Sequence, residues 1–315
     1  MAVRKWFRLV RGNNLLLIAL TQLLVHYTLI VPILKMAGLS PTLANGWVAV
    51  LVLATVLVAA GGYIINDYFD VKTDTINRPG RVVIDRSIPR RHALLLHQIT
   101  TWAGIVLAVG VSWKVANLKL AGVFLLAAAM LWLYSAAYKR KALAGNIVVA
   151  LLTALVVILP PLYERQLFQP AGGPAMQAAR TILIVVFCYF VFAFLLSLVR
   201  EWVKDLQDME GDRRSGRRTL PLLWGQVRVR QLSVLLLLLI MLLIGIVQGY
   251  QLSGRDYVSV FTLIVMLQLP LAASVYFLLW PQRSEPYRLV SHLLKWTMLM
   301  GILTMLYFYL VTLPR

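Results

Sequence analysis

The stretch that decides the fold is residues 45–74, NGWVAVLVLATVLVAAGGYIINDYFDVKTD. No residue from Ala44 to Ile65 is charged, and three carboxylates, Asp67, Asp70 and Asp74, then follow in close succession. A helix needs about twenty predominantly apolar residues to cross the hydrocarbon core of a bilayer. The stretch therefore predicts a transmembrane helix that has three aspartates at its end.

The rest of the chain shares this apolar character. Of its 315 residues, 60% are hydrophobic and 14% are charged, whereas soluble domains are about a quarter charged. We therefore predict an all-α polytopic membrane protein that forms a single domain over residues 1–315. The expected membrane spans are residues 14–35, 45–66, 97–113, 119–138, 145–163, 179–199, 231–250, 257–280 and 292–312. The only cysteine, Cys188, excludes a disulfide within the chain.

The basic residues predict the orientation. Most of the 31 lysines and arginines fall in the segments that share a side with the amino terminus, and short cytoplasmic loops carry such an excess. We expect the amino terminus and the aspartate loops to be cytoplasmic and the carboxyl terminus to lie on the opposite side. The net charge of +19 then reflects topology and attraction to membrane lipids rather than binding to nucleic acid. The first apolar run lacks a cleavage site and is interpreted as a span, not a signal peptide.

A second aspartate motif follows the sixth expected span. Residues 200–221 read REWVKDLQDMEGDRRSGRRTLP, in which Asp205, Asp208 and Asp212 repeat the DxxDxxxD spacing of the first motif. Positions i, i+3 and i+7 share one helix face, so each motif predicts a carboxylate stripe at the cytoplasmic end of a span. Mg²⁺ in proteins is bound by a few carboxylates together with substrate phosphates. The paired motifs therefore indicate Mg²⁺ ions that bind a diphosphate.

Other interpretations of the aspartates are weaker. A single motif is compatible with a solvated helix end that forms surface ion pairs, but two copies with the same spacing argue against that. CDP-alcohol phosphotransferases concentrate their acidic residues in one continuous motif that is missing here. A cation-coupled transporter more often places acidic residues at the membrane midplane, whereas these cluster at one face.

The motifs together resemble the UbiA family of intramembrane prenyltransferases. The residues that carry the resemblance are NDYFDVKTD (66–74), NRPGR (77–81), KDLQDMEGDRRSGRRTLP (204–221) and LYSAAYKRKALAGN (133–146). The resemblance implies nine transmembrane helices around a central cavity, with a cytoplasmic cap made by the 2–3 and 6–7 loops. It also implies the reaction, in which an allylic prenyl diphosphate ionises and an acceptor captures the carbocation.

The resemblance assigns the acidic residues to metal binding. Asp67 and Asp70, with Asn66 beside them, are expected to bind one Mg²⁺, and Asp74 is a further ligand or lies just behind the ligands. Asp208 and Asp212 are expected to bind a second Mg²⁺, so that two ions bridge the diphosphate. Asp205 is placed near the acceptor.

Basic and aromatic residues near the motifs complete the expected site. The residues expected to bind substrate, mainly its diphosphate or phosphate, are Lys139, Lys204, Arg78, Arg81, Arg200 and Arg217. A tyrosine is also expected, either Tyr134 or Tyr138, because the spacing from Tyr134 to Lys139 is one residue longer than in some family members.

The acceptor is the least determined part of the prediction. The segments around Lys139 and Asp205 look most similar to the branch of the family that prenylates geranylgeranylglyceryl phosphate, with a geranylgeranyl diphosphate donor. Aromatic acceptors of the 4-hydroxybenzoate, naphthoate or homogentisate type remain alternatives, as does a tetrapyrrole. The surplus of basic residues favours a phosphorylated acceptor over an aromatic carboxylate.

Overall fold

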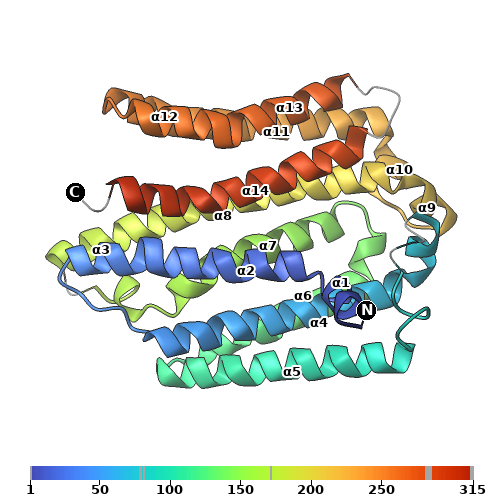
Figure 1. Ribbon diagram of the computed structural model, residues 1–315, viewed down its shortest axis with the longest axis horizontal. Helices are drawn as coiled ribbons and strands as arrows, with labels where there is room; N and C mark the ends of the chain where they lie inside the picture. Colours follow the sequence, from blue (N-terminus) through green and yellow to red (C-terminus); the bar gives the residue numbers. More distant parts are fainter. Residues whose placement is uncertain (1, 78–79, 81, 171, 281–285, 313–315) are drawn as a thin grey trace. The chain divides into compact units, whose positions relative to one another are not determined.

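The computed structural model describes residues 2–77, 80, 82–170, 172–280 and 286–312 (Figure 1). Apart from two isolated β-bridges, the regular elements in these ranges are helices. Nine of the described helices are long and apolar enough to cross a membrane, which confirms the predicted number and makes the chain an integral multi-pass membrane protein. Their bounds are Gly12–Met36, Asn45–Asn77, Arg90–Lys114, Leu118–Ala136, Ala144–Leu162, Gly173–Gln207, Gln226–Ser253, Tyr257–Leu279 and Pro286–Val311.

Several spans contain more than one helical element. The first consists of α2 (Gly12–Leu24), a π-helix η1 (Val25–Ile30) and α3 (Val31–Met36). The eighth has the same composition, with α12 (Tyr257–Leu263), a π-helix η6 (Ile264–Gln268) and α13 (Leu269–Leu279). In the fourth span, a short 3₁₀ turn (Leu118–Leu120) leads into α6 (Ala121–Ala136). The other spans are single helices: α4 (Asn45–Asn77), α5 (Arg90–Lys114), α7 (Ala144–Leu162), α8 (Gly173–Gln207), α11 (Gln226–Ser253) and α14 (Pro286–Thr312).

The chain divides into two compact units, which are described separately. The first unit comprises the residues up to Lys139 together with Ala154–Phe190, and the second comprises Arg140–Thr153 and the residues from Val191 onward. The prediction of a single domain over the whole chain stays a prediction.

The first unit is built around α4 (Asn45–Asn77), which packs against α2, α5 (Arg90–Lys114) and α6. Two glycines bring α4 and α5 close together. A Cβ atom on Gly61 would lie 2.2 Å from the hydroxyl of Thr101, and one on Gly104 would lie 2.8 Å from the carbonyl oxygen of Ala54. Small residues allow such close approach between membrane helices, where van der Waals packing is a main driving force for association.

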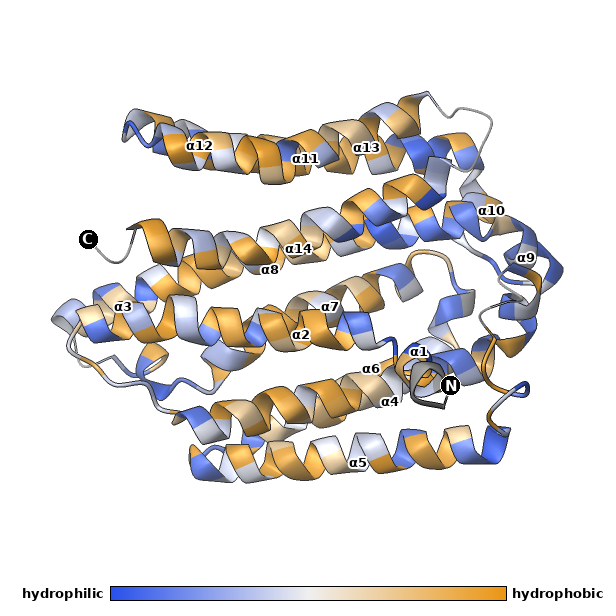
Figure 2. Cartoon of the chain, viewed as in Figure 1, coloured by the Kyte–Doolittle hydropathy of each residue, from blue (hydrophilic) through white to orange (hydrophobic). Residues whose placement is uncertain are grey.

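The second unit is built around α11 (Gln226–Ser253), α13 and α14 (Pro286–Thr312). Leucines such as Leu237, Leu271 and Leu294 are fully buried where these helices meet the last part of α8. Figure 2 shows hydrophobic colouring along α11 and α13, and hydrophilic colouring over the short helix α9 (Met209–Arg214).

The motif helices extend past the apolar spans that the sequence predicts. The second span was expected to end at residue 66, but α4 continues to Asn77. The sixth was expected to end at residue 199, but α8 (Gly173–Gln207) continues for two further turns. Several of the motif residues therefore lie on helical extensions of the spans rather than in loops.

Candidate active site

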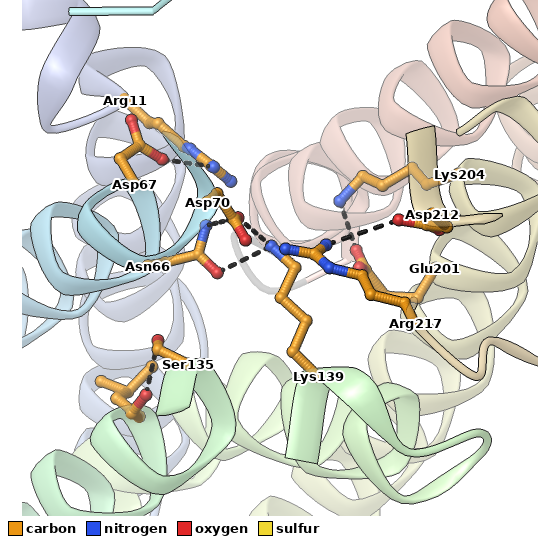
Figure 3. Close-up of polar contacts among 11 residues, drawn as sticks. Arg11, Asn66, Asp67, Asp70, Ser135, Lys139, Glu201, Lys204, Asp212 and Arg217 are labelled. Carbon is orange, nitrogen blue, oxygen red and sulfur yellow. Dashed lines mark hydrogen bonds and ion pairs between the residues drawn. The ribbon is translucent and has the colours of Figure 1, made fainter. Parts of the chain in front are cut away.

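The first cluster is formed by the end of α4 together with Lys139 (Figure 3). Lys139, in a 3₁₀ turn at Tyr138–Arg140, donates to the side-chain oxygen of Asn66 at 2.9 Å and forms an ion pair with Asp70. Asn66 also donates to Asp70, with 3.0 Å between the amide nitrogen and the carboxylate oxygen. Asp70 is only 3% exposed, and a carboxylate at such a depth requires a paired charge and hydrogen bonds.

Arg11 is a member of this cluster that the sequence reasoning missed. Its guanidinium donates to Asp67 at 2.8 Å and lies over the ring of Tyr63, 5.2 Å from the ring centroid. The residue joins α1 (Ala2–Leu9) to α2 in a left-handed backbone conformation, with φ 52° and ψ 52°. The only signal in the sequence was one basic residue among several near the amino terminus, and nothing there linked it to Asp67.

Two further expected residues lie near Lys139. The Lys139 ammonium is 5.8 Å from the ring centroid of Tyr134, a distance at which a cation is attracted to an aromatic face. Tyr138 directly precedes Lys139 and is half-buried. Because Tyr138 also has a contact in the structure, the choice between the two tyrosines stays a prediction.

Asp74 follows Asp70 by one helical turn on α4 and is half-buried. Because α4 is continuous from Asn45 to Asn77, all three carboxylates of the first motif share one face of one helix, as predicted. Arg78 and Arg81, which the sequence analysis expected to bind the diphosphate, lie outside the described residues.

The second cluster has a different backbone from the first. Asp205 is on α8, which ends at Gln207, and Asp212 is on α9. Asp208 lies between the two helices with φ −97° and ψ 8°, outside the helical region. The expected single-helix stripe is therefore wrong for the second motif, because the chain bends at its middle aspartate.

The partners of the second cluster come from two places. Asn146, near the start of α7 (Ala144–Leu162), donates to Asp205 at 2.9 Å. Arg217 pairs with Asp212 at 3.5 Å, and its backbone N–H donates to the Asp212 carbonyl at 2.9 Å. Between Asp212 and Arg217 the chain turns at Gly216, whose φ of +69° is readily adopted only by glycine. Asn146 was present in a quoted motif but was given no role.

Lys204 was expected to bind a diphosphate or a phosphorylated acceptor beside Asp205. In the structure it forms an ion pair with Glu201, one turn earlier on α8. Glu201 also lies 3.7 Å from the guanidinium of Arg200. Glu201 was not expected to have a role, although it contacts two of the expected substrate-binding cations.

The donor set of both clusters fits a hard divalent cation. Asn66, Asp67 and Asp70 offer oxygen atoms, as do Asp205 and Asp212, and Mg²⁺ prefers oxygen ligands. Among the described residues, no three acidic, histidine or cysteine side chains are gathered closely enough to hold a metal ion by themselves. Carboxylates of both clusters instead pair with Arg11, Lys139 and Arg217, which shows that positive charge is favourable at these positions.

Comparison with known proteins places the chain in a family. The model of the UbiA prenyltransferase family matches residues 28–311. The digeranylgeranylglyceryl phosphate synthase of Hyperthermus butylicus is 31% identical over 241 residues, which cover 76% of this chain and 74% of that protein. The chain belongs to the UbiA prenyltransferase family and is a membrane-embedded prenyltransferase, as its motifs predicted.

Solved structures show the same fold. A structure of digeranylgeranylglyceryl phosphate synthase matches with a TM-score of 0.63 and 22% identity, covering 97% of each chain. A UbiA homolog from Archaeoglobus fulgidus, bound to GPP and Mg²⁺, matches with a TM-score of 0.60 and 16% identity, covering 94% of this chain and 99% of that one. Both matches support the all-helical architecture with nine spans.

Proposed function

We propose that the chain is a Mg²⁺-dependent enzyme that transfers a geranylgeranyl group from its diphosphate to geranylgeranylglyceryl phosphate. The proposal rests most on the similarity to the Hyperthermus butylicus digeranylgeranylglyceryl phosphate synthase over three quarters of both chains. Several lysines and arginines lie around the second motif. This supports a phosphorylated acceptor, because an aromatic acceptor with a carboxylate would need only one such cation.

The residues of the first cluster act on the donor. The bond between C1 of the prenyl chain and the diphosphate oxygen breaks, its electron pair leaves with the diphosphate, and an allylic carbocation remains. Lys139 and Arg11 are fixed positive groups at the place where this negative charge develops, and preorganised charges of this kind stabilise such a transition state strongly. Mg²⁺ bound at the aspartates supplies further charge neutralisation to the diphosphate.

The carbocation is captured by the acceptor. The aromatic face of Tyr134, beside Lys139, stabilises positive charge. The acceptor hydroxyl oxygen forms the new ether bond to C1 and loses its proton. Asp205, which Asn146 holds by a hydrogen bond of 2.9 Å, is the group that we propose accepts this proton. Asp208 and Asp212 provide metal ligands.

The remaining cations serve the anionic parts of the substrates. We propose that Lys204, Arg200 and Arg217 assist in binding phosphate groups, with Arg78 and Arg81 at the diphosphate. The positive-inside distribution of lysine and arginine supports a cytoplasmic position for the amino terminus and for both motifs.

A screen of donors and acceptors tests the proposal. Purified protein is supplied with prenyl diphosphates of ten to twenty carbons, each paired with geranylgeranylglyceryl phosphate or an aromatic acceptor, and pyrophosphate release and prenylated product are measured. We expect release only when an allylic donor and the glyceryl phosphate acceptor are both present, and only with Mg²⁺. Efficient turnover of an aromatic acceptor and none of the glyceryl phosphate would overturn the assignment.

The metal assignment is tested by alanine substitution at one aspartate of each motif. D67A and D208A should insert into membranes at normal levels and lose Mg²⁺-dependent turnover. Retained activity in either variant would contradict the ligand role of that residue.

A further inference from the structure

The last turns of α8 present three distinct faces within the second unit. Leu196, Val199 and Val203 belong to the apolar core that α8 shares with α11, α13 and α14. Leu198, Trp202 and Leu206 belong to a second apolar cluster, which includes Ala150 of α7. At 100° per residue, these two sets cover a little under half of the helix circumference. The remaining face carries polar residues at consecutive turns, namely Ser197, Arg200, Glu201, Lys204 and Asp205.

Two atoms on this polar face are buried without a hydrogen-bond partner. One is the hydroxyl of Ser197 and the other is Nε of Arg200. Ser197 is 4% exposed, and the Arg200 side chain is 20% exposed. A buried polar group that lacks a partner costs about 1–3 kcal/mol, and more when it is charged. Both atoms can donate a hydrogen bond, and they lie three residues apart, so they are neighbours on the same face.

Glu201 positions the cations of this face. It pairs with Lys204 one turn further along the helix and lies 3.7 Å from the terminal nitrogen of Arg200. Because Glu201 is near the end of the Arg200 guanidinium, the Nε–H of that group is left for another acceptor. An arginine with an N–H group left to donate is suited to binding a phosphate, because the N–H groups of its planar guanidinium match the positions of the phosphate oxygens.

We propose that Ser197 and Arg200, with Lys204 beside them, form the subsite that binds the phosphate of the acceptor, and that Glu201 is a positioning residue for it. This inference rests on the proposed function, because it concerns the same phosphorylated acceptor. A rise of 1.5 Å per residue places Arg200 about 7–8 Å from Asp205 along the axis of α8. Five residues also turn the helix by about 140°, so the acceptor would extend around the polar face from its phosphate at Arg200, past Lys204, to its hydroxyl at Asp205.

The test compares two acceptors that differ only in the phosphate. Purified wild type, S197A and R200Q are assayed with geranylgeranylglyceryl phosphate and with geranylgeranylglycerol, at saturating donor. R200Q should raise the KM for the phosphorylated acceptor roughly ten- to a hundredfold, as expected for a lost charge-assisted hydrogen bond, and S197A should raise it about two- to tenfold. The kcat, the KM for the donor, and kcat/KM for geranylgeranylglycerol should stay unchanged.

Matched variants separate binding from folding. R200K should recover only part of the affinity, because lysine lacks the Nε–H donor. E201Q should raise the KM for the phosphorylated acceptor alone, because Arg200 and Lys204 lose the carboxylate that positions both of them. R180Q removes an exposed arginine twenty residues earlier on α8 and should change neither acceptor's KM.

The outcomes distinguish the subsite from the reaction. If wild type does not prenylate the glyceryl phosphate, the proposed function fails and the subsite fails with it. If wild type is active but S197A and R200Q leave the KM for the phosphorylated acceptor unchanged, the subsite alone is overturned. Equal losses on both acceptors would also overturn it, because they would indicate a structural role.

Discussion

The two aspartate clusters have the same DxxDxxxD spacing but are built differently. The first lies on one uninterrupted helix, and its carboxylates pair with cations from distant parts of the chain, Arg11 and Lys139. The second bends at Asp208; Asn146 contacts its Asp205 from α7, and its Asp212 pairs with Arg217, five residues later. Carboxylates on one continuous helix cannot adjust independently, whereas those on either side of a bend can. Two motifs with the same spacing in the sequence can therefore differ in how far their carboxylates can move.

The largest effect is expected from removing a carboxylate charge in the first cluster. D70N should lower the rate of prenyl transfer roughly a thousandfold or more, because it weakens an expected Mg²⁺ ligand and removes the ion pair that holds Lys139 in place. D208N should also lower the rate of prenyl transfer strongly. Excess Mg²⁺ should restore part of the activity, because the chain can adjust at the bend at Asp208. Mg²⁺ titrations of the transfer rate measure both.

The control for these variants is E210Q, which changes an exposed acidic residue close to the second motif. It should keep normal activity. If D70N and D208N show the same loss and the same dependence on Mg²⁺, the two clusters are equivalent and the contrast between them is wrong.

Removing a cation should also lower kcat more in the first cluster than in the second. K139Q should lower kcat about a hundredfold, a typical loss for one preorganised donor, because Lys139 contacts both Asn66 and Asp70. R217Q should lower it only about tenfold, because its contact with Asp212 is longer, at 3.5 Å. Steady-state kinetics at saturating donor and acceptor give the comparison. A larger loss for R217Q would reverse the order of the two clusters.

A smaller effect is expected from the turn that follows α9. In G216A an added Cβ would meet no atom within 4 Å, so the only penalty is the left-handed backbone at φ +69°. This should cost about 1 kcal/mol and shift Arg217 relative to Asp212, which we expect to weaken the apparent affinity for Mg²⁺ a fewfold. G249A is the matched control, because a Cβ added to this helical glycine would also meet no atom within 4 Å. It should not change the apparent affinity for Mg²⁺. Normal Mg²⁺ dependence in G216A would show that this turn does not position the cluster.

The smallest effect concerns a buried carboxylate whose partners are neutral. Glu164, 2% exposed and just beyond the end of α7, accepts hydrogen bonds from the backbone and hydroxyl of Thr42. Burial raises the pKa of this carboxyl above its ordinary value, against the opposing effect of the Thr42 hydrogen bonds. The unfolded chain therefore ionises first, and this group's contribution makes the fold less stable as the pH rises above the unfolded pKa. E164Q should flatten that part of the pH dependence in thermal unfolding scans, and an unchanged slope would contradict it.

The membrane spans could be predicted from the sequence because hydropathy is a local property of about twenty residues. The ends of the motif helices could not be predicted in this way. The hydrophobic stretch ends at the first charged residues, whereas the helices continue to Asn77 and Gln207. The π-helices at Val25–Ile30 and Ile264–Gln268 also left no recognisable pattern. Charge and apolarity predict where a segment crosses the bilayer, but not where its backbone geometry changes.

The candidate site was predictable to a similar degree. Asn66, Asp70 and Lys139 carry a motif, and the structure brings them together. Arg11, Asn146 and Ser197 belong to residue types that are ordinary in their surroundings, and their importance arises only from contacts or burial in the folded chain. A residue of this kind is identified by its partners, or by the lack of them, and neither is visible in one sequence.

The left-handed residue Arg11 has a practical consequence for handling the protein. Its backbone turns α1 away from α2, while its side chain is bonded to Asp67 and Arg8 donates to the carbonyl of Gly80. Shortening the chain at its amino terminus, or attaching a bulky tag there, would therefore disturb the charge beside an expected metal ligand. A loss of activity in such a preparation calls for adding Mg²⁺ to protein that has been shown to be inserted in the membrane, because recovery would then trace the loss to Asp67.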